Sequence, residues 1–185
     1  MGAALPPVPL CKTGGGKAGE NGVRSLRRPA ESSSRPQLVL VMCYGNICRS
    51  PFAAGRLHAM LSSSGILVES AGLYGPGRSA PLEAQAAARA RGVELRDHSS
   101  RLVTAKQVAG ADLIIVMEAF QARSLIRDYG ATPDKLMLLG DLDPMPIRTR
   151  RIQDPEGQSL DVFSDVYSRI ERCLRSLTAA VDAPT

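Results

Sequence analysis

The stretch LVLVMCYGNICRSP, residues 38–51, decides the fold. Its first five residues form a continuous apolar run, which is typical of a strand buried on both faces of a parallel sheet. Pro51 is a favourable residue for a first helical turn, so we expect a helix to begin directly after the polar residues. The stretch therefore predicts a strand, a tight loop and a helix in succession.

The rest of the chain continues this alternation. Short apolar runs predict three further strands, at residues 66–68, 112–117 and 135–139. Helical patterns separate or follow them, at residues 53–61, 84–91, 120–126 and 163–181. Strands that alternate with helices predict an α/β fold, a three-layer sandwich in which a four-stranded parallel sheet is flanked by helices. Ligands of such sheets bind at the carboxyl ends of the strands, where the loop after the first strand lies.

Residues 1–36 differ in composition from the rest of the chain. They mix Gly, Pro, Ser and Arg with almost no apolar periodicity, so we expect a disordered basic extension, followed by one domain over residues 37–181. The extension carries +4 (six basic minus two acidic residues) of the formal net charge of +5. It is either dispensable or contacts an acidic partner or anionic lipid. The remaining near-neutral domain has few aromatic residues, which argues against nucleic-acid binding.

Cysteine usage and hydropathy indicate the compartment. The four cysteines are too few and too irregular for a disulfide framework, and no Cys/His grouping has the spacing of a zinc site. No apolar run is long enough to cross a bilayer, and no secretory signal opens the chain. We therefore expect a cytoplasmic protein with reduced thiols, no metal or other cofactor, and no integral membrane segment.

Cys43 and Arg49 bound a seven-residue arc that can wrap one phosphate. The backbone N–H groups of such an arc point inward, and the helix that follows places its positive N-terminal end beneath a bound dianion. The same field favours the thiolate form of Cys43, which can attack phosphorus directly. Arg49 offers a planar fork that pairs with two phosphate oxygens and follows them into the transition state.

The other residues of the arc also have physical uses. Gly45 permits a tight turn, Asn46 tolerates a left-handed backbone, and Ser50 can donate a hydrogen bond to the thiolate. The alternative is a strand-to-helix turn with a buried, inert cysteine, but the strand before the arc and the helix after it favour a catalytic loop. The expected phosphate- and substrate-binding residues are Tyr44, Gly45, Asn46, Ile47, Cys48 and Ser50.

The arc resembles the signature of the low-molecular-weight protein tyrosine phosphatases, which runs Cys, any residue, Gly-Asn-Ile-Cys-Arg-Ser-Pro. The likeness extends from about Leu38 to Leu177 and includes residues 70–72, 117–118 and 152–155. Phe163 and Tyr167 follow at the spacing of bacterial members, which often oppose tyrosine autokinases in exopolysaccharide export. The resemblance implies hydrolysis of protein phosphotyrosine through a cysteinyl-phosphate intermediate on Cys43.

The resemblance also implies a general acid. Asp154 would protonate the departing tyrosine oxygen and then, as a base, activate the water that hydrolyses the intermediate, a contribution of about 10² to 10⁴ in rate. The alternative is that Asp154-Pro155 only opens a turn, as we expect of Asp143-Pro144. Asp154 is preferred because Ile152 precedes it and the aromatic pair of the last helix follows it.

Supporting residues are implied in the same way. The family ties its loop asparagine to two serines and a histidine, which here are Asn46, Ser50, Ser70 and His98. For His98 the alternative is an ordinary surface histidine. Cys48 is either a redox guard, able to form a reversible disulfide with Cys43, or a small packing residue.

One segment departs from the family pattern. Many relatives have Tyr directly after the Asp-Pro pair, where it forms an aromatic wall for the substrate ring, whereas this chain has Glu156-Gly157. We therefore expect a more open and more acidic cleft, with Leu73 and Tyr74 available for an opposing wall. Three basic residues upstream of the acid either favour acidic partners or form a solvated loop; they are Arg148, Arg150 and Arg151.

Three other functions fit parts of this pattern. Arsenate reductases have a related fold and loop but need further redox cysteines, and residues 49–172 contain none. Protein arginine phosphatases typically have Thr where this chain has Ile47, whose apolar side chain favours an aromatic leaving group. An inactive phosphotyrosine-binding module would not need Cys43, Arg49 and Asp154 together. The expected partners are therefore tyrosine-phosphorylated proteins, including a tyrosine autokinase.

Overall fold

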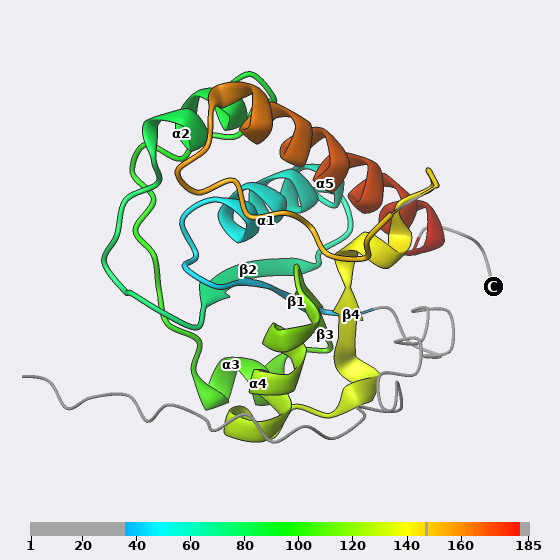
Figure 1. Cartoon of the computed structure of the whole chain (residues 1–185). Coiled ribbons are helices and arrows are strands. Elements are labelled where there is room, and N and C mark those ends of the chain that lie inside the picture. The colour runs from blue at the N-terminus through cyan, green and yellow to red at the C-terminus, as the bar shows by residue number, and fades with distance from the viewer. Residues whose placement is uncertain (1–35, 147, 182–185) are drawn as a thin grey trace, which may run out of the picture.

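The computed structural model describes residues 36–146 and 148–181, in which four strands alternate with five α-helices (Figure 1). The strands are β1 (Leu38–Cys43), β2 (Leu67–Gly72), β3 (Leu113–Val116) and β4 (Leu136–Leu138). The α-helices are α1 (Arg49–Met60), α2 (Leu82–Arg89), α3 (Ala105–Gly110), α4 (Ala119–Tyr129) and α5 (Leu160–Val181). Two 3₁₀ helices flank β4, namely η2 (Pro133–Lys135) and η3 (Leu139–Leu142). The extension expected over residues 1–36 lies outside the described residues except for Pro36.

The four strands form one parallel sheet in the order β2-β1-β3-β4. β1 is therefore an interior strand, and Val41 lies beside Ser70 of β2 on one side and Ile115 of β3 on the other. Because the strands are parallel, the carboxyl ends of β1, β2 and β3 meet at one edge of the sheet. The predicted four-stranded parallel sheet is confirmed.

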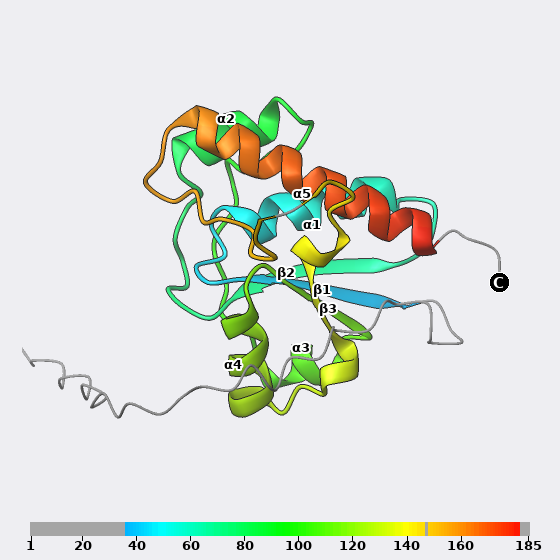
Figure 2. The same ribbon diagram turned by 45° about the vertical axis from the view of Figure 1, so that its right-hand side comes forward.

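Helices cover both faces of this sheet. In Figures 1 and 2, α1, α2 and α5 lie on one side of the strands, and α3 and α4 lie on the other. Alternate residues of β1 serve the two cores: Val39 and Val41 pack beneath α1 and α5, whereas Leu40 and Met42 pack against α3 and α4. All four side chains are buried, which explains why β1 is a continuous apolar run. The predicted three-layer sandwich is confirmed.

The helices differ from the prediction in one respect, because α3 was not expected. It is short, and Val108 is its one buried residue, so it has no apolar stripe to reveal it. A capping box stabilises its start: Thr104 Oγ1 accepts a hydrogen bond from Gln107 N at 3.2 Å, and Gln107 Oε1 accepts one from Thr104 N at 3.1 Å. Of the helices in the described part of the chain, none is both long enough and apolar enough to span a bilayer.

An aromatic stack joins α1 to α5 beneath the loop that follows β1. The rings of Phe52 and Tyr167 lie parallel with centroids 3.8 Å apart, and Phe163 meets Tyr167 edge-on at 6.0 Å. Tyr167 Oη donates a hydrogen bond of 3.0 Å to the carbonyl oxygen of Cys48. Burial raises the pKa of Tyr167, so its hydroxyl remains a neutral donor. The long C-terminal helix thereby fixes the end of the loop.

Candidate active site

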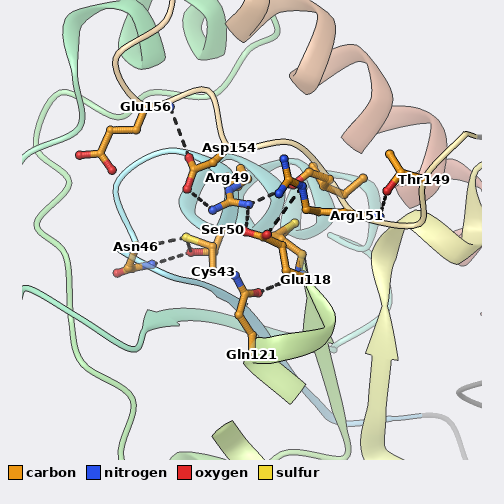
Figure 3. Close-up of polar contacts among 12 residues, drawn as sticks. Cys43, Asn46, Arg49, Ser50, Glu118, Gln121, Thr149, Arg151, Asp154 and Glu156 are labelled. Carbon is orange, nitrogen blue, oxygen red and sulfur yellow. Dashed lines mark hydrogen bonds and ion pairs between the residues drawn. The ribbon is translucent and has the colours of Figure 1, made fainter. Parts of the chain in front are cut away.

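Cys43 ends β1, and residues 43–49, the phosphate loop, lead from it into α1 (Figure 3). Its Sγ atom accepts a hydrogen bond of 3.2 Å from Asn46 N and lies 3.0 Å from Ser50 Oγ. A backbone N–H at this position stabilises negative charge on the sulfur. The side chain is 2% exposed, so the sulfur lies at the base of the loop rather than on the surface.

Asn46 connects the phosphate loop to neighbouring segments by hydrogen bonds. It has φ 51°, which makes it the one non-glycine residue with positive φ in the described chain. Its Nδ2 donates to Ser50 Oγ at 2.9 Å and to Ser70 Oγ at 3.0 Å, and its Oδ1 accepts from Arg101 N at 2.9 Å. His98 Nε2 lies 2.6 Å from the Asn46 carbonyl oxygen. The structure thus brings together the asparagine, both serines and the histidine that the family resemblance implied.

Gly72, at the end of β2, allows the phosphate loop to approach the sheet edge. A Cβ atom at this position would lie 2.8 Å from Tyr44 O and 2.9 Å from Asn46 N, closer than real side chains come. The next two backbone amides, of Leu73 and Tyr74, both donate to Tyr44 O, at 2.8 and 3.0 Å. The backbone around the end of β2 therefore braces the loop directly.

Two further loop residues are closely packed by their neighbours. Gly45 was expected to permit the tight turn, and it directly precedes Asn46, which has the left-handed conformation expected of it. What Gly45 provides is space, since a Cβ atom there would lie 3.2 Å from Arg78 Nη1. Ile47 is 3% exposed and belongs to the core beneath α1, so it contributes packing more than contact surface.

Arg49 is 1% exposed and its guanidinium is held from several sides. Nη1 donates to Glu118 Oε1 at 2.8 Å and to Ile152 O at 3.0 Å, and Nη2 contacts the carboxylate of Asp154. Its buried Nε has no hydrogen-bond partner among the described residues. A buried donor of this kind is costly unless a ligand atom satisfies it.

Glu118 is a site residue to which the sequence analysis gave no role. It follows β3, and its second carboxylate oxygen lies 3.7 Å from Arg151 Nε. The buried Gln121 accepts hydrogen bonds from Met117 N at 2.9 Å and from Glu118 N at 3.2 Å, which fixes the backbone before α4. The sequence feature that could have identified Glu118 is its position, an acidic residue directly at the carboxyl end of a predicted parallel strand.

Asp154 lies in the acid loop, residues 152–158, which leads into α5. Ile152 is fully buried and its amide donates to Met117 O at 3.0 Å, so the start of the acid loop is anchored at the end of β3. The Asp154 side chain is 41% exposed, faces Arg49, and accepts a hydrogen bond of 3.3 Å from Glu156 N. The carboxylate therefore lies beside the phosphate loop with access to water.

Asp143 anchors the segment that precedes the acid loop. Its side chain is 1% exposed and accepts hydrogen bonds from Arg169 Nε at 2.9 Å and Arg172 Nε at 3.3 Å. Arg169 also donates to Thr149 O at 2.7 Å and to Arg151 O at 2.9 Å. The expectation that Asp143 only opens a turn is wrong, because its carboxylate connects this segment to α5.

Asp143→Asn is expected to lower the free energy of unfolding by about 2 kcal/mol at pH 7, because it removes a buried charge from paired arginines. Burial favours the neutral form of Asp143, but hydrogen bonds from Arg172, the Met145 amide and Arg169 outweigh it and lower its pKa. The charged Asp143 therefore makes its full contribution to the free energy of unfolding above the unfolded-state pKa of about 3.9. This contribution is lost as the pH falls through the lower pKa of the folded state.

Urea unfolding of the parent protein and Asp143→Asn at several pH values measures this effect. The exposed Asp165 of α5 supplies the control variant, Asp165→Asn. The gap between parent and Asp143→Asn should be constant near neutral pH and shrink in acid. A gap that is absent at pH 7, or that is the same at every pH, would contradict the assignment.

The thiols of the described chain are all unpaired, at Cys43, Cys48 and Cys173. Burial and the nearby Cys43 raise the pKa of Cys48, and burial with the nearby Asp143 raises the pKa of Cys173 to about 12. Both are therefore neutral thiols at pH 7. The redox-guard role of Cys48 stays a prediction, and Cys11 lies outside the described residues.

Aromatic side chains flank the phosphate loop on one side. Tyr44 and Tyr74 stack with centroids 5.5 Å apart and planes 8° apart, and Phe120 lies 6.2 Å from Tyr44 at 59°. Both tyrosines are exposed, so their rings are accessible to a ligand. Of the two residues considered for a wall, Tyr74 lies here, whereas Leu73 packs against the core below the sheet. Phe120 was recognised only as a helix residue.

The charges around the site are largely paired. Glu156 was expected to make the cleft acidic, but it forms an ion pair of 2.6 Å with Arg78. Upstream of Asp154, Arg150 forms an ion pair with Asp141, and Arg148 is exposed. The cleft is therefore less acidic than the sequence suggested.

Comparisons with known proteins agree on one family. Residues 38–184 match the family described as low molecular weight phosphotyrosine protein phosphatase. The low molecular weight protein-tyrosine-phosphatase Etp of Escherichia coli K12 is 36% identical over 136 residues, 72% of this chain and 87% of that protein. The crystal structure of the Erwinia amylovora tyrosine phosphatase AmsI has a TM-score of 0.74 and 34% identity, covering 82% and 97% of the two chains. The YwlE arginine phosphatase of Geobacillus stearothermophilus has a TM-score of 0.69 and 25% identity, covering 78% and 92%.

Proposed function

The chain is a protein-tyrosine-phosphatase that belongs to the low molecular weight phosphotyrosine protein phosphatase family, and we propose how its residues divide the chemistry. Cys43 is the nucleophile, Arg49 holds the phosphate and Asp154 is the general acid and base. The observation that carries this proposal is the arrangement of Arg49, whose buried guanidinium contacts Asp154 and whose Nε remains an available donor.

The first step forms a phosphoenzyme. The Cys43 thiolate donates an electron pair to phosphorus, and the bond from phosphorus to the tyrosine oxygen breaks as the sulfur–phosphorus bond forms. Protonated Asp154 transfers its proton to the departing oxygen, so tyrosine leaves as a neutral phenol. The hydrogen bond that Cys43 Sγ accepts from Asn46 N supports the anionic sulfur before attack, and Ser50 Oγ, 3.0 Å away, can donate a second one.

The second step returns the enzyme to its starting form. Asp154, now a carboxylate, takes a proton from water while the water oxygen attacks phosphorus. The sulfur–phosphorus bond breaks, and the electron pair returns to Cys43. The exposure of Asp154 supports this step, because water reaches the carboxylate directly.

Arg49 connects the two roles of Asp154. Nη2 of Arg49 contacts the Asp154 carboxylate. A phosphate dianion that pairs with the Arg49 guanidinium takes the place of this carboxylate, which leaves Asp154 free to face the leaving-group oxygen. Glu118 keeps Arg49 oriented during the exchange through its contact of 2.8 Å.

The leaving group is proposed to be tyrosine. The stacked Tyr44 and Tyr74 offer an exposed aromatic surface at the phosphate loop, which suits a phenyl ring better than a flexible guanidinium chain. The likeness to a YwlE arginine phosphatase makes phosphoarginine the second candidate. The two differ in the acceptor of the Asp154 proton, an oxygen in one and a nitrogen in the other.

The proposed physiological partners are tyrosine-phosphorylated proteins, among them a tyrosine autokinase of exopolysaccharide production. This rests on the resemblance to bacterial members of the family. The cytosol is the proposed compartment, because a reducing environment keeps the Cys43 thiol available for catalysis. A chromosomal neighbourhood without kinase and polysaccharide-export genes would weaken the pathway assignment.

Peptides of one sequence carrying phosphotyrosine, phosphoarginine or phosphoserine test the reaction, with Cys43→Ser as the blank. We expect rapid phosphate release from the phosphotyrosine peptide, slower release from phosphoarginine and none from phosphoserine. Phosphoarginine hydrolysed faster than phosphotyrosine would overturn the leaving-group assignment. Release that is the same with the blank would overturn the mechanism.

A further inference from the structure

Arg78 and Glu156 form an ion pair at the edge of the active site. Arg78 Nη2 lies 2.6 Å from Glu156 Oε1, and the two side chains are 39% and 43% exposed. Arg78 comes from the segment between β2 and α2, and Glu156 comes from the acid loop. Arg78 Nη1 also lies beside Gly45, since a Cβ atom there would be 3.2 Å away. The pair therefore lies next to the phosphate loop and joins its two flanking segments.

Hydrogen bonds hold the backbone at the Arg78 end of this pair. Arg78 N donates to the hydroxyl of buried Ser100 at 2.9 Å, and Ser100 N donates to Arg78 O at 2.9 Å. The same hydroxyl donates to Gly75 O at 2.6 Å. A Cβ atom at Gly75 would come within 2.9 Å of Arg78 Cδ, so the arginine side chain lies closely over the backbone. The backbone of Arg78 is thus held in place, and its side chain extends over Gly75 to Glu156.

At the other end of the pair, the backbone of Glu156 contacts Asp154, the proposed general acid. The amide of Glu156 donates to Asp154 Oδ1 at 3.3 Å, so the position of this residue bears on the orientation of the carboxylate. Among the described residues, the contact between Glu156 and Arg78 is the one hydrogen bond that joins residues 155–159 to residues 72–80. The tip of the acid loop therefore has a single polar attachment to that side of the active site.

We propose that Arg78 and Glu156 are positioning residues that hold Asp154 where it can protonate the leaving group. This inference rests on the proposed role of Asp154 as general acid. Glu156 follows the Asp154-Pro155 pair directly, and its ion pair with Arg78 fixes the acid loop beside the phosphate loop. The pair thereby favours substrates that need a proton to leave, such as phosphotyrosine, over esters of acidic phenols.

Arg78→Gln and Glu156→Gln are each expected to lower kcat/KM for a phosphotyrosine peptide by roughly threefold to fivefold, because exposed ion pairs make contributions of about this size. For an ester of a strongly acidic phenol, such as 2,4-dinitrophenyl phosphate, we expect almost no change. The reason is that an acidic phenolate leaves without a proton, so a displaced Asp154 has little consequence.

A series of aryl phosphates with phenols of graded acidity provides the test. We expect a plot of log kcat/KM against phenol acidity to be steeper for both single variants than for the parent. The double variant Arg78→Glu with Glu156→Arg, which restores the pair in reverse, should recover part of the parental slope. Arg175→Gln, which removes an exposed charge from α5, should follow the parent.

The outcomes separate the inference from the function on which it rests. A uniform loss across the series, a change confined to KM, or no change would each overturn the positioning role while leaving the phosphatase assignment intact. If the parent protein hydrolysed no aryl phosphate in a Cys43-dependent manner, the proposed mechanism itself would fail.

Discussion

Cys43→Ser is expected to lower phosphotyrosine hydrolysis by roughly 10⁴-fold or more while leaving binding of the phosphorylated peptide largely intact. A serine hydroxyl is neutral at pH 7 and needs a base to become a nucleophile. The sulfur contacts the Asn46 amide and Ser50, neither of which is a base, and His98 already contacts the Asn46 carbonyl oxygen. Arg49 and the loop amides that we propose to bind phosphate are unchanged.

Phosphate release measures the loss, and fluorescence polarisation with a labelled phosphotyrosine peptide measures the binding. Cys173→Ser is the matched control, because Cys173 is a buried thiol of α5 outside the site. Retention of a tenth of the parental rate by Cys43→Ser would assign the attack to another group. Loss of peptide binding together with activity would indicate that the substitution disrupts the protein, and circular dichroism would show whether its helices and strands remain.

The phosphate loop could be predicted from the sequence because its parts are contiguous. The apolar run of β1, the polar arc and Pro51 follow one another in the chain, so each local preference agrees with its neighbours. Cys43 and Ser50 are seven residues apart and meet at 3.0 Å because the loop is short. The left-handed backbone was expected at Asn46, and Asn46 has it.

Contacts between distant segments could not be predicted in this way. Glu118 meets Arg49 from 69 residues away, and Arg78 meets Glu156 across 78 residues. Such pairs depend on the relative positions of the strand ends and loops, which no local pattern encodes. Glu156 was therefore interpreted as free negative charge at the cleft.

The sequence likewise does not predict whether an individual side chain points into the core or toward the site. Leu73 and Tyr74 are consecutive and were treated as equivalent candidates for a substrate wall. Their amides both bind Tyr44 O, yet Leu73 packs into the core whereas Tyr74 stacks on the exposed ring of Tyr44. The short helix α3 was missed for a related reason, since a capping box rather than an apolar stripe defines it.

Asp154→Asn is expected to lower kcat/KM for a phosphotyrosine peptide by about 10²-fold, near the lower end of the range for general acids. The lower end applies because the Asp154 side chain is 41% exposed, so water can deliver part of the missing proton. An asparagine keeps the size of the side chain and the contact with Arg49 but has no proton to transfer at neutral pH. The step most affected is the departure of a poorly acidic phenol.

Aryl phosphates of graded phenol acidity separate this role from simple pairing with Arg49. The loss should shrink to less than about tenfold for 2,4-dinitrophenyl phosphate, whose phenolate leaves unaided. Asp161→Asn removes an exposed carboxylate from the first turn of α5 and should leave the whole series unchanged. Equal losses for every ester would mean that Asp154 acts only through Arg49. Because kcat/KM reports phosphoenzyme formation alone, the result does not depend on how quickly water hydrolyses the intermediate.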